Sequence, residues 1–170
     1  SQELNSRKAT AFHEAGHVMA FIQSDIRFQY VTIKPWRGYL GRVKHKPQPR
    51  SVLTKSFFLN PGFFSKRFKR DIIYFAGALA EGMFSQDAEI EQAGCHDDIL
   101  KTFSTCADLS DELREKYIQF AVTYTKDLMI HNWGKVTAIA EGLLEHETLT
   151  YQEVLTIVNK SVVDQINSES

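Results

Sequence analysis

Five consecutive residues, His13-Glu14-Ala15-Gly16-His17, combine two metal-binding side chains with a carboxylate that can act as a base. If this segment is helical, His13 and His17 lie on one face, about 5–6 Å apart. That spacing allows both imidazoles to bind one tetrahedral zinc ion, with Glu14 close enough to take a proton from an activated water. The motif therefore predicts a hydrolytic zinc site. Because the pattern also arises by chance, the alternative is a pair of ordinary helical histidines.

A catalytic zinc site usually has three protein ligands, so a third ligand is expected further along the chain. Glu81 is one candidate, because it lies in an apolar segment where an unpaired carboxylate is costly. A second group lies in Gly94-Cys95-His96-Asp97-Asp98, which holds four metal-capable side chains. Residue types alone do not choose between them, since an acid in the first turn of a helix also complements the helix dipole.

The spacing of apolar residues predicts a mainly α (α+β) fold in which the histidines lie on the first helix. Two strands, at residues 28–33 and 39–43, are expected to form a small β hairpin around a turn at Trp36-Arg37-Gly38. Asn5 or Ser6 is expected to cap the first helix. Residues 46–64 are expected to be irregular and 86–93 to form an acidic loop. The helices are expected at residues 6–24, through 72–83, from near Gly94 to Cys106, and at 109–130, 135–146 and 150–166.

Length and composition are those of one globular domain, spanning residues 1–170. No apolar run approaches the roughly 20 residues that cross a bilayer, and the beginning of the sequence lacks the pattern of a signal peptide. Cys95 and Cys106 are too far apart to bridge if they share a helix. A reducing, cytoplasmic location is therefore expected.

Charge is strongly segregated along the chain. Residues 26–70 contain twelve Lys or Arg and no acid, whereas residues 71–170 contain eighteen acids and six Lys or Arg. We expect the two parts to neutralise each other in the fold; the alternative is a basic surface for an acidic neighbouring subunit or acidic chains. The basic, Phe-rich segment 51–70 is expected to fold its aromatic rings onto the core. No nucleic acid is expected as a partner, since the segment matches no known reading motif.

Five blocks of sequence follow one another along the chain: Thr10–His17, Val31–Pro35 with Leu40-Gly41, Phe75–Glu81, Gly94 with Asp98, Ile99 and Thr102, and Ala140–Glu145 with Glu147–Leu149. In this order they resemble the peptidase domain of the FtsH-type ATP-dependent zinc metalloproteases, over residues 7–158. The resemblance implies that Asp98 is the third zinc ligand. The sequence departs from the family at Asp97, where the family has Asn, and throughout residues 51–70.

The resemblance implies a zinc metalloendopeptidase acting on unfolded or flexible polypeptides. Its metal ligands would be His13, His17 and Asp98, and its general base Glu14. Glu81 is expected to hold a histidine from outside the metal shell, or else to replace Asp98 as ligand. The other alternative ligands are Asp97 and His96, and the strand residues expected to pair with substrate are Leu40 and Gly41.

Partners implied by the family are an AAA+ ATPase domain or partner chain and a homo-oligomeric ring. This sequence contains neither the family's ATPase nor its membrane anchor, and Gly77-x-x-x-x-Gly82 lacks the Lys-Ser/Thr of a phosphate-binding loop. The alternative function is a zinc-binding assembly or adaptor domain with weak or no hydrolysis. Glu14 argues against that alternative, because a purely structural site does not need a base.

Overall fold

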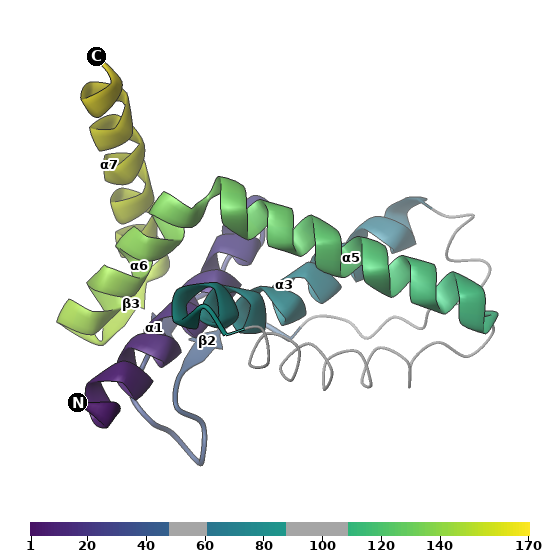
Figure 1. Cartoon of the computed structure of the whole chain (residues 1–170), viewed down its shortest axis with the longest axis horizontal. Helices are drawn as coiled ribbons and strands as arrows, with labels where there is room; N and C mark the ends of the chain where they lie inside the picture. The colour runs from purple at the N-terminus through teal and green to yellow at the C-terminus, as the bar shows by residue number, and fades with distance from the viewer. Residues whose placement is uncertain (48–60, 88–108) are drawn as a thin grey trace.

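A computed structural model describes residues 1–47, 61–87 and 109–170, with side chains described for all of these except residues 61–65. The described residues form five helices and one small antiparallel sheet, which confirms a mainly helical fold (Figure 1). The helices are α1 (Gln2–Gln23), α3 (Pro61–Ser85), α5 (Asp111–His131), α6 (Trp133–His146) and α7 (Tyr151–Glu169). The strands are β1 (Tyr30–Thr32), β2 (Arg42–Lys44) and β3 (Thr148–Thr150).

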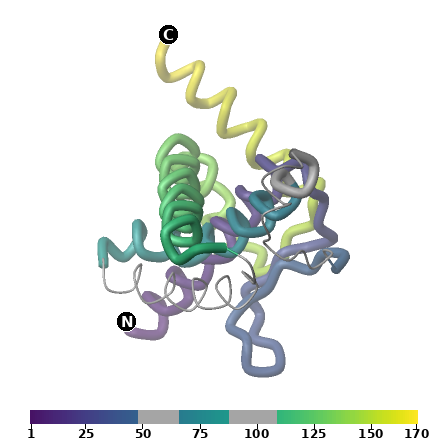
Figure 2. Tube along the Cα trace, turned by 90° about the vertical axis from the view of Figure 1, so that its right-hand side faces the viewer, coloured from purple at the N-terminus to yellow at the C-terminus, as the bar shows by residue number. Residues whose placement is uncertain are grey.

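The centre of the molecule is the packing of α1 against α3, with α6 against another side of α1. Helix α5 lies along α3, and α7 projects away from the body beyond its contacts with α6 and β3 (Figures 1 and 2). None of the described helices is long and apolar enough to cross a membrane. The apolar core draws on all of these elements; its fully enclosed members include Val18, Met19, Phe75, Leu79, Met129, Ile139 and Leu143.

Gly16 permits an unusually close approach of α1 and α3. A Cβ atom at this position would lie 2.4 Å from the carbonyl oxygen of Ala76 and 2.6 Å from the Cβ of Ala80. Glycine weakens a helix interior by about 1 kcal/mol relative to alanine, so its presence here needs a packing reason. The packing reason is the backbone of α3, which occupies the space that a side chain on Gly16 would fill.

The sheet has three strands, in the order β2-β1-β3, rather than the two of the expected hairpin. The third strand, β3, was not anticipated because only four residues, 147–150, separate α6 from α7. Thr150 ends β3 and also caps α7, in a reciprocal arrangement with Glu153. The second strand begins at Arg42, so Leu40 and Gly41 lie in the segment that leads into β2, not within a strand.

Two helix starts differ from expectation. Ser1, rather than Asn5 or Ser6, caps α1, because a helix can begin at any residue whose side chain reaches a free backbone N–H. Helix α3 begins at Pro61, so residues 61–64 are helical rather than irregular. Proline suits the first helical position because its missing N–H would be unpaired there anyway. The predicted helix near Gly94 lies outside the described residues.

A buried ionic cluster joins α3 to α5. Arg67 donates from Nε to Asp71 Oδ2 at 2.9 Å, and the Tyr117 hydroxyl donates to the same oxygen at 2.5 Å. All three side chains are buried, and the burial together with the charge of Asp71 raises the pKa of Tyr117. Outside the core, Lys34 of the basic segment lies 3.6 Å from Glu147 of the acidic one. The Arg67–Asp71 pair and the Lys34–Glu147 pair each join the basic part of the chain to the acidic part.

Candidate metal centre

His13 and His17 lie one turn apart on α1 and converge on a single point. Their Nε2 atoms are 3.1 Å apart, and both side chains are partly buried. Two nitrogens bound to one tetrahedral zinc at about 2.0–2.1 Å would be separated by roughly 3.3 Å. The spacing of the two nitrogens is therefore close to the spacing that a shared zinc ion requires.

The ring of His17 is oriented by the backbone of α3. Its Nδ1 lies 2.6 Å from the carbonyl oxygen of Ile73, which can only accept a hydrogen bond, so Nδ1 carries the proton. Burial, followed by the charge of His13, lowers the pKa of His17 to about 3. His17 is therefore neutral near pH 7, and its Nε2 presents a free lone pair.

The ring of His13, on α1, is oriented by a side chain of α3. Its Nδ1 lies 2.8 Å from Glu81 Oε2, in a partly buried pair. A carboxylate at this nitrogen fixes the ring orientation and makes the opposite nitrogen a better metal ligand. Because Nδ1 and Nε2 are on different edges of the imidazole, this Glu81 oxygen lies away from the point on which the two Nε2 atoms converge.

Two Nε2 lone pairs at 3.1 Å repel each other unless something positive lies between them. A metal cation bound to both nitrogens satisfies that requirement, and so does one proton on His13 Nε2 donated to His17 Nε2. Metal and proton therefore compete for the same place, as they do in metal sites generally. The arrangement fits a cation held by two imidazoles.

Glu14 lies between the two histidines in sequence and is 6% exposed. Burial raises its pKa to about 7, with the charge of His13 acting in the opposite direction and that of Glu81 adding to the rise. The segment before β2 covers this carboxylate: a Cβ atom at Gly41 would lie 2.8 Å from Glu14 Cγ and 2.9 Å from Oε1. A carboxyl group that titrates near neutrality is well matched to general-base work at physiological pH.

Gly77 of α3 provides the space in front of the two rings. A Cβ atom at this position would lie 2.4 Å from His17 Nε2 and 2.7 Å from His13 Nε2. Neither the Gly77 contact nor the Ile73 carbonyl had been singled out from the sequence. An isolated glycine inside an apolar helix is a recognisable signal of close approach, whereas a backbone carbonyl carries no signal in residue type.

Some of the remaining predicted site residues lie within the described part of the chain and others do not. Asp98, Asp97 and His96 lie outside the described residues. Among residues 1–47, 61–87 and 109–170, no group of three His, Cys, Asp or Glu is placed to hold a metal. Leu40 is 62% exposed, at the surface beside Gly41. The described residues therefore supply two imidazoles and leave the third ligand open.

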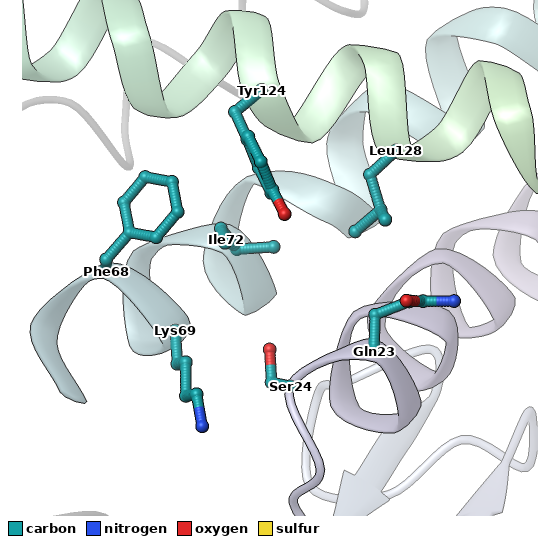
Figure 3. Close-up of a pocket in the computed structure, with 7 residues that line it drawn as sticks. All are labelled: Gln23, Ser24, Phe68, Lys69, Ile72, Tyr124 and Leu128. Atoms are coloured by element: carbon teal, nitrogen blue, oxygen red, sulfur yellow. The ribbon is translucent and has the colours of Figure 1, made fainter. Parts of the chain in front are cut away.

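A separate hollow of about 130 Å³ lies at the C-terminal end of α1, between α1, α3 and α5 (Figure 3). Its wall contains no His, Cys, Asp or Glu, so it lacks the usual metal-binding side chains. Figure 3 shows side chains from the three helices facing a common space. The lining residues are Gln23, Ser24, Phe68, Lys69, Ile72, Tyr124 and Leu128.

Replacing Gly77 by alanine is expected to weaken metal binding while leaving the helix intact. The new Cβ atom would occupy the space beside both Nε2 atoms, so we expect Gly77→Ala to weaken zinc affinity at least tenfold in a competitive chelator titration. The matched control is Gly134→Ala on α6, where a Cβ meets nothing within 4 Å. Equal zinc affinity in Gly77→Ala and the parent would contradict the proposed location of the metal.

Metal-free protein is expected to show a pH-dependent stability effect from Glu14. The folded-state pKa of about 7 exceeds the ordinary glutamate value of 4.5, so the stabilising contribution is complete below about 4.5 and is lost as pH rises through 7. Glu14→Gln should therefore change the free energy of unfolding very little at pH 4.5. At pH 8 it should raise the free energy of unfolding by on the order of 2 kcal/mol.

Urea unfolding in the presence of a chelator measures this difference at the two pH values. The control is Glu141→Gln on the exposed surface of α6, which should change the free energy of unfolding similarly at both. If Glu14→Gln has the same effect at pH 4.5 and pH 8, the burial of an ionisable carboxyl group at this position is not as described.

A comparison of the chain with models of known protein families finds no match. The resemblance to FtsH-type peptidases accordingly rests on the sequence blocks quoted above. Of these blocks, the one with the histidines and the one with Glu81 lie side by side on α1 and α3. The functional argument depends on that local geometry.

Proposed function

We propose that this chain is a zinc-dependent metalloendopeptidase that hydrolyses peptide bonds in unfolded or flexible proteins. The observation that carries the proposal is the convergence of His13 Nε2 and His17 Nε2 to 3.1 Å, with each Nδ1 held by an acceptor on α3. Ordinary surface histidines have no need of two oriented acceptors and a glycine-lined space in front of them. The buried carboxyl group of Glu14 adds the base that a structural zinc site would not require.

The proposed metal ligands are His13, His17 and Asp98, of which Asp98 follows from the family resemblance alone. Bound zinc would supply Lewis acidity, which acidifies a water molecule and polarises the scissile carbonyl group. Glu81 holds the ring of His13, and the Ile73 carbonyl holds that of His17. The two rings are thus oriented before any ion or substrate arrives, which reduces the entropic cost of assembling the site.

Glu14 has the role of proton carrier in this proposal. In its ionised form, it accepts a proton from the attacking water and then transfers it to the leaving amine nitrogen. Its burial beneath the Gly41 segment excludes bulk water from the carboxylate and holds its pKa near neutrality. Positive charge in the site would lower that pKa and keep the group ionised at pH 7.

An extended substrate is proposed to run along the segment that enters β2. In the described sheet, β2 is an outer strand, with β1 on its one paired side. Strand addition at such an edge uses main-chain hydrogen bonds and so accepts many sequences. Leu40 and Gly41 lie where this segment passes Glu14, and the close packing of Gly41 on Glu14 would bring a paired substrate near the base.

The proposal predicts that Glu14→Gln abolishes casein cleavage while zinc remains bound. Glutamine keeps the shape of the side chain but cannot accept the proton, so the rate should fall by about a hundredfold or more. Zinc content is measured by metal analysis of the dialysed protein, and cleavage by release of labelled peptides. The control is Glu141→Gln, which removes an exposed carboxylate on α6 and should cleave at the parent rate.

Three results would contradict the peptidase proposal. Cleavage by Glu14→Gln at the parent rate would remove Glu14 from the mechanism. Zinc binding by the parent protein with no cleavage of casein would favour the alternative, a zinc-binding assembly or adaptor domain. Loss of zinc from the parent on dialysis, with no cleavage after zinc is restored, would contradict both.

A further inference from the structure

The outer face of the sheet, which turns away from α1, carries a row of polar side chains across all three strands. Thr148, Thr32 and Arg42 are cross-strand partners in β3, β1 and β2. The opposite face contributes Val31 and Leu149 to the core. Next to the row is a hollow of about 420 Å³, lined by Tyr30, Thr32, Lys34, Pro35, Trp36, Arg42 and Thr148.

Among the described residues, the lining of this hollow contains two cations, Lys34 and Arg42, and no acid. Lys34 Nζ lies 3.6 Å from Glu147, which also pairs with Arg7 at 3.2 Å. One carboxylate is thus shared by two cations, and Arg42 has no acidic partner among the described ion pairs. The hollow therefore has an excess of positive charge, consistent with the absence of acids from residues 26–70.

The guanidinium group of Arg42 is held in place by aromatic rings. Its central carbon lies 4.1 Å from the centre of the Trp36 ring and 5.4 Å from that of Tyr30, and its Nη2 donates to the Tyr30 hydroxyl. Its Nε is buried and has no hydrogen-bond partner among the described residues. The two rings and the Tyr30 hydroxyl thus hold the guanidinium group at the wall of the hollow.

A tight turn fixes the aromatic wall. Trp36 and Tyr39 exchange two backbone hydrogen bonds of 2.9 Å, and Arg37 and Gly38 between them have φ values of 47° and 85°. These positive φ values belong to the type of turn that matches the twist of a β hairpin. The loop projects from the body of the molecule (Figure 2), and Trp36 is 42% exposed.

We propose that this hollow binds a phosphomonoester group, through Arg42 and Lys34. Such a group carries close to two negative charges at neutral pH, which matches the two cations. The planar fork of an arginine binds phosphate oxygens through parallel N–H donors. The hollow is larger than a phosphate ion needs, so the group would be carried by a small molecule or a lipid headgroup.

Titration with inorganic phosphate, followed by the indole N–H resonance of Trp36, tests this site directly. The chain has two tryptophans, and the variant Trp133→Phe identifies the Trp36 signal. We expect a saturable shift of Trp36 that sodium chloride at equal ionic strength does not produce. Arg42→Gln should weaken phosphate binding about tenfold, and Lys34→Gln should weaken it as well.

The matched control is Arg37→Gln. Arg37 also lies over the Trp36 ring, at 4.7 Å, but does not line the hollow, so its removal should change affinity less than threefold. Vesicles of phosphatidylcholine with and without phosphatidic acid identify the source of the group. If the protein sediments only with vesicles that contain phosphatidic acid, and Arg42→Gln removes this sedimentation, the phosphate group belongs to a lipid headgroup. If the protein binds phosphate but does not sediment with the vesicles, the group belongs to a small molecule.

Absence of a saturable shift together with absence of sedimentation would overturn the proposal. Equal weakening by Arg37→Gln and Arg42→Gln would also overturn it, because general electrostatic attraction would then explain the binding. Circular dichroism of each variant shows whether the sheet is retained, and Lys34→Gln tests the site without altering β2. The site is independent of the metal, so these results neither support nor contradict the proposed peptidase activity.

Discussion

The close contact between α1 and α3 is the constraint on which the proposed metal site depends. Helix α1 carries both histidines, but every group that orients their rings belongs to α3. Gly16 lets the two backbones approach, Ile73 and Glu81 hold the two Nδ1 atoms, and Gly77 leaves the Nε2 atoms uncovered. A shift of α3 by one residue would replace an acceptor by an apolar side chain and bring a Cβ atom against the imidazoles. The register of these helices is therefore a requirement of the proposed metal site as well as of packing.

The sheet contributes to the same site from the other side of α1. A Cβ atom at Gly41 would lie 2.9 Å from the carbonyl oxygen of Thr32 in β1, and Gly41 in turn covers Glu14. Removing this segment would expose the carboxylate to water and return its pKa towards the ordinary value, since burial is the largest cause of the shift. Strand β3 joins the same sheet and leads directly into α7. The C-terminal part of the described chain is thus connected to the environment of Glu14.

Much of this arrangement is visible in the sequence where residue type and spacing carry the information. The spacing of His13 and His17 predicts a shared helical face, and Thr150 with Glu153 explains the start of α7. Glu81 was expected near a histidine because an isolated acid in an apolar helix needs a partner. The structure places it at His13 Nδ1.

Other features depend on distant backbone contacts and leave little trace in local sequence. Strand β3 has only three residues and exists because β1 pairs with it across more than a hundred positions. The carbonyl of Ile73 belongs to a residue of no distinctive chemistry. The start of α1 at Gln2 depended on Ser1, one of several residues capable of capping it. The position of Asp98 lies outside the described residues, so its part in the site comes from the resemblance.

X-ray absorption at the zinc edge of the metal-loaded protein tests the central assignment most directly. The account predicts two imidazole nitrogens at about 2.0–2.1 Å, one carboxylate oxygen at about 2.0–2.2 Å, and no sulfur ligand. The two imidazole contributions should disappear when His13 and His17 are replaced together by Asn. A spectrum without imidazole scattering from the parent protein, or one unchanged in that double variant, would show that the ion binds elsewhere.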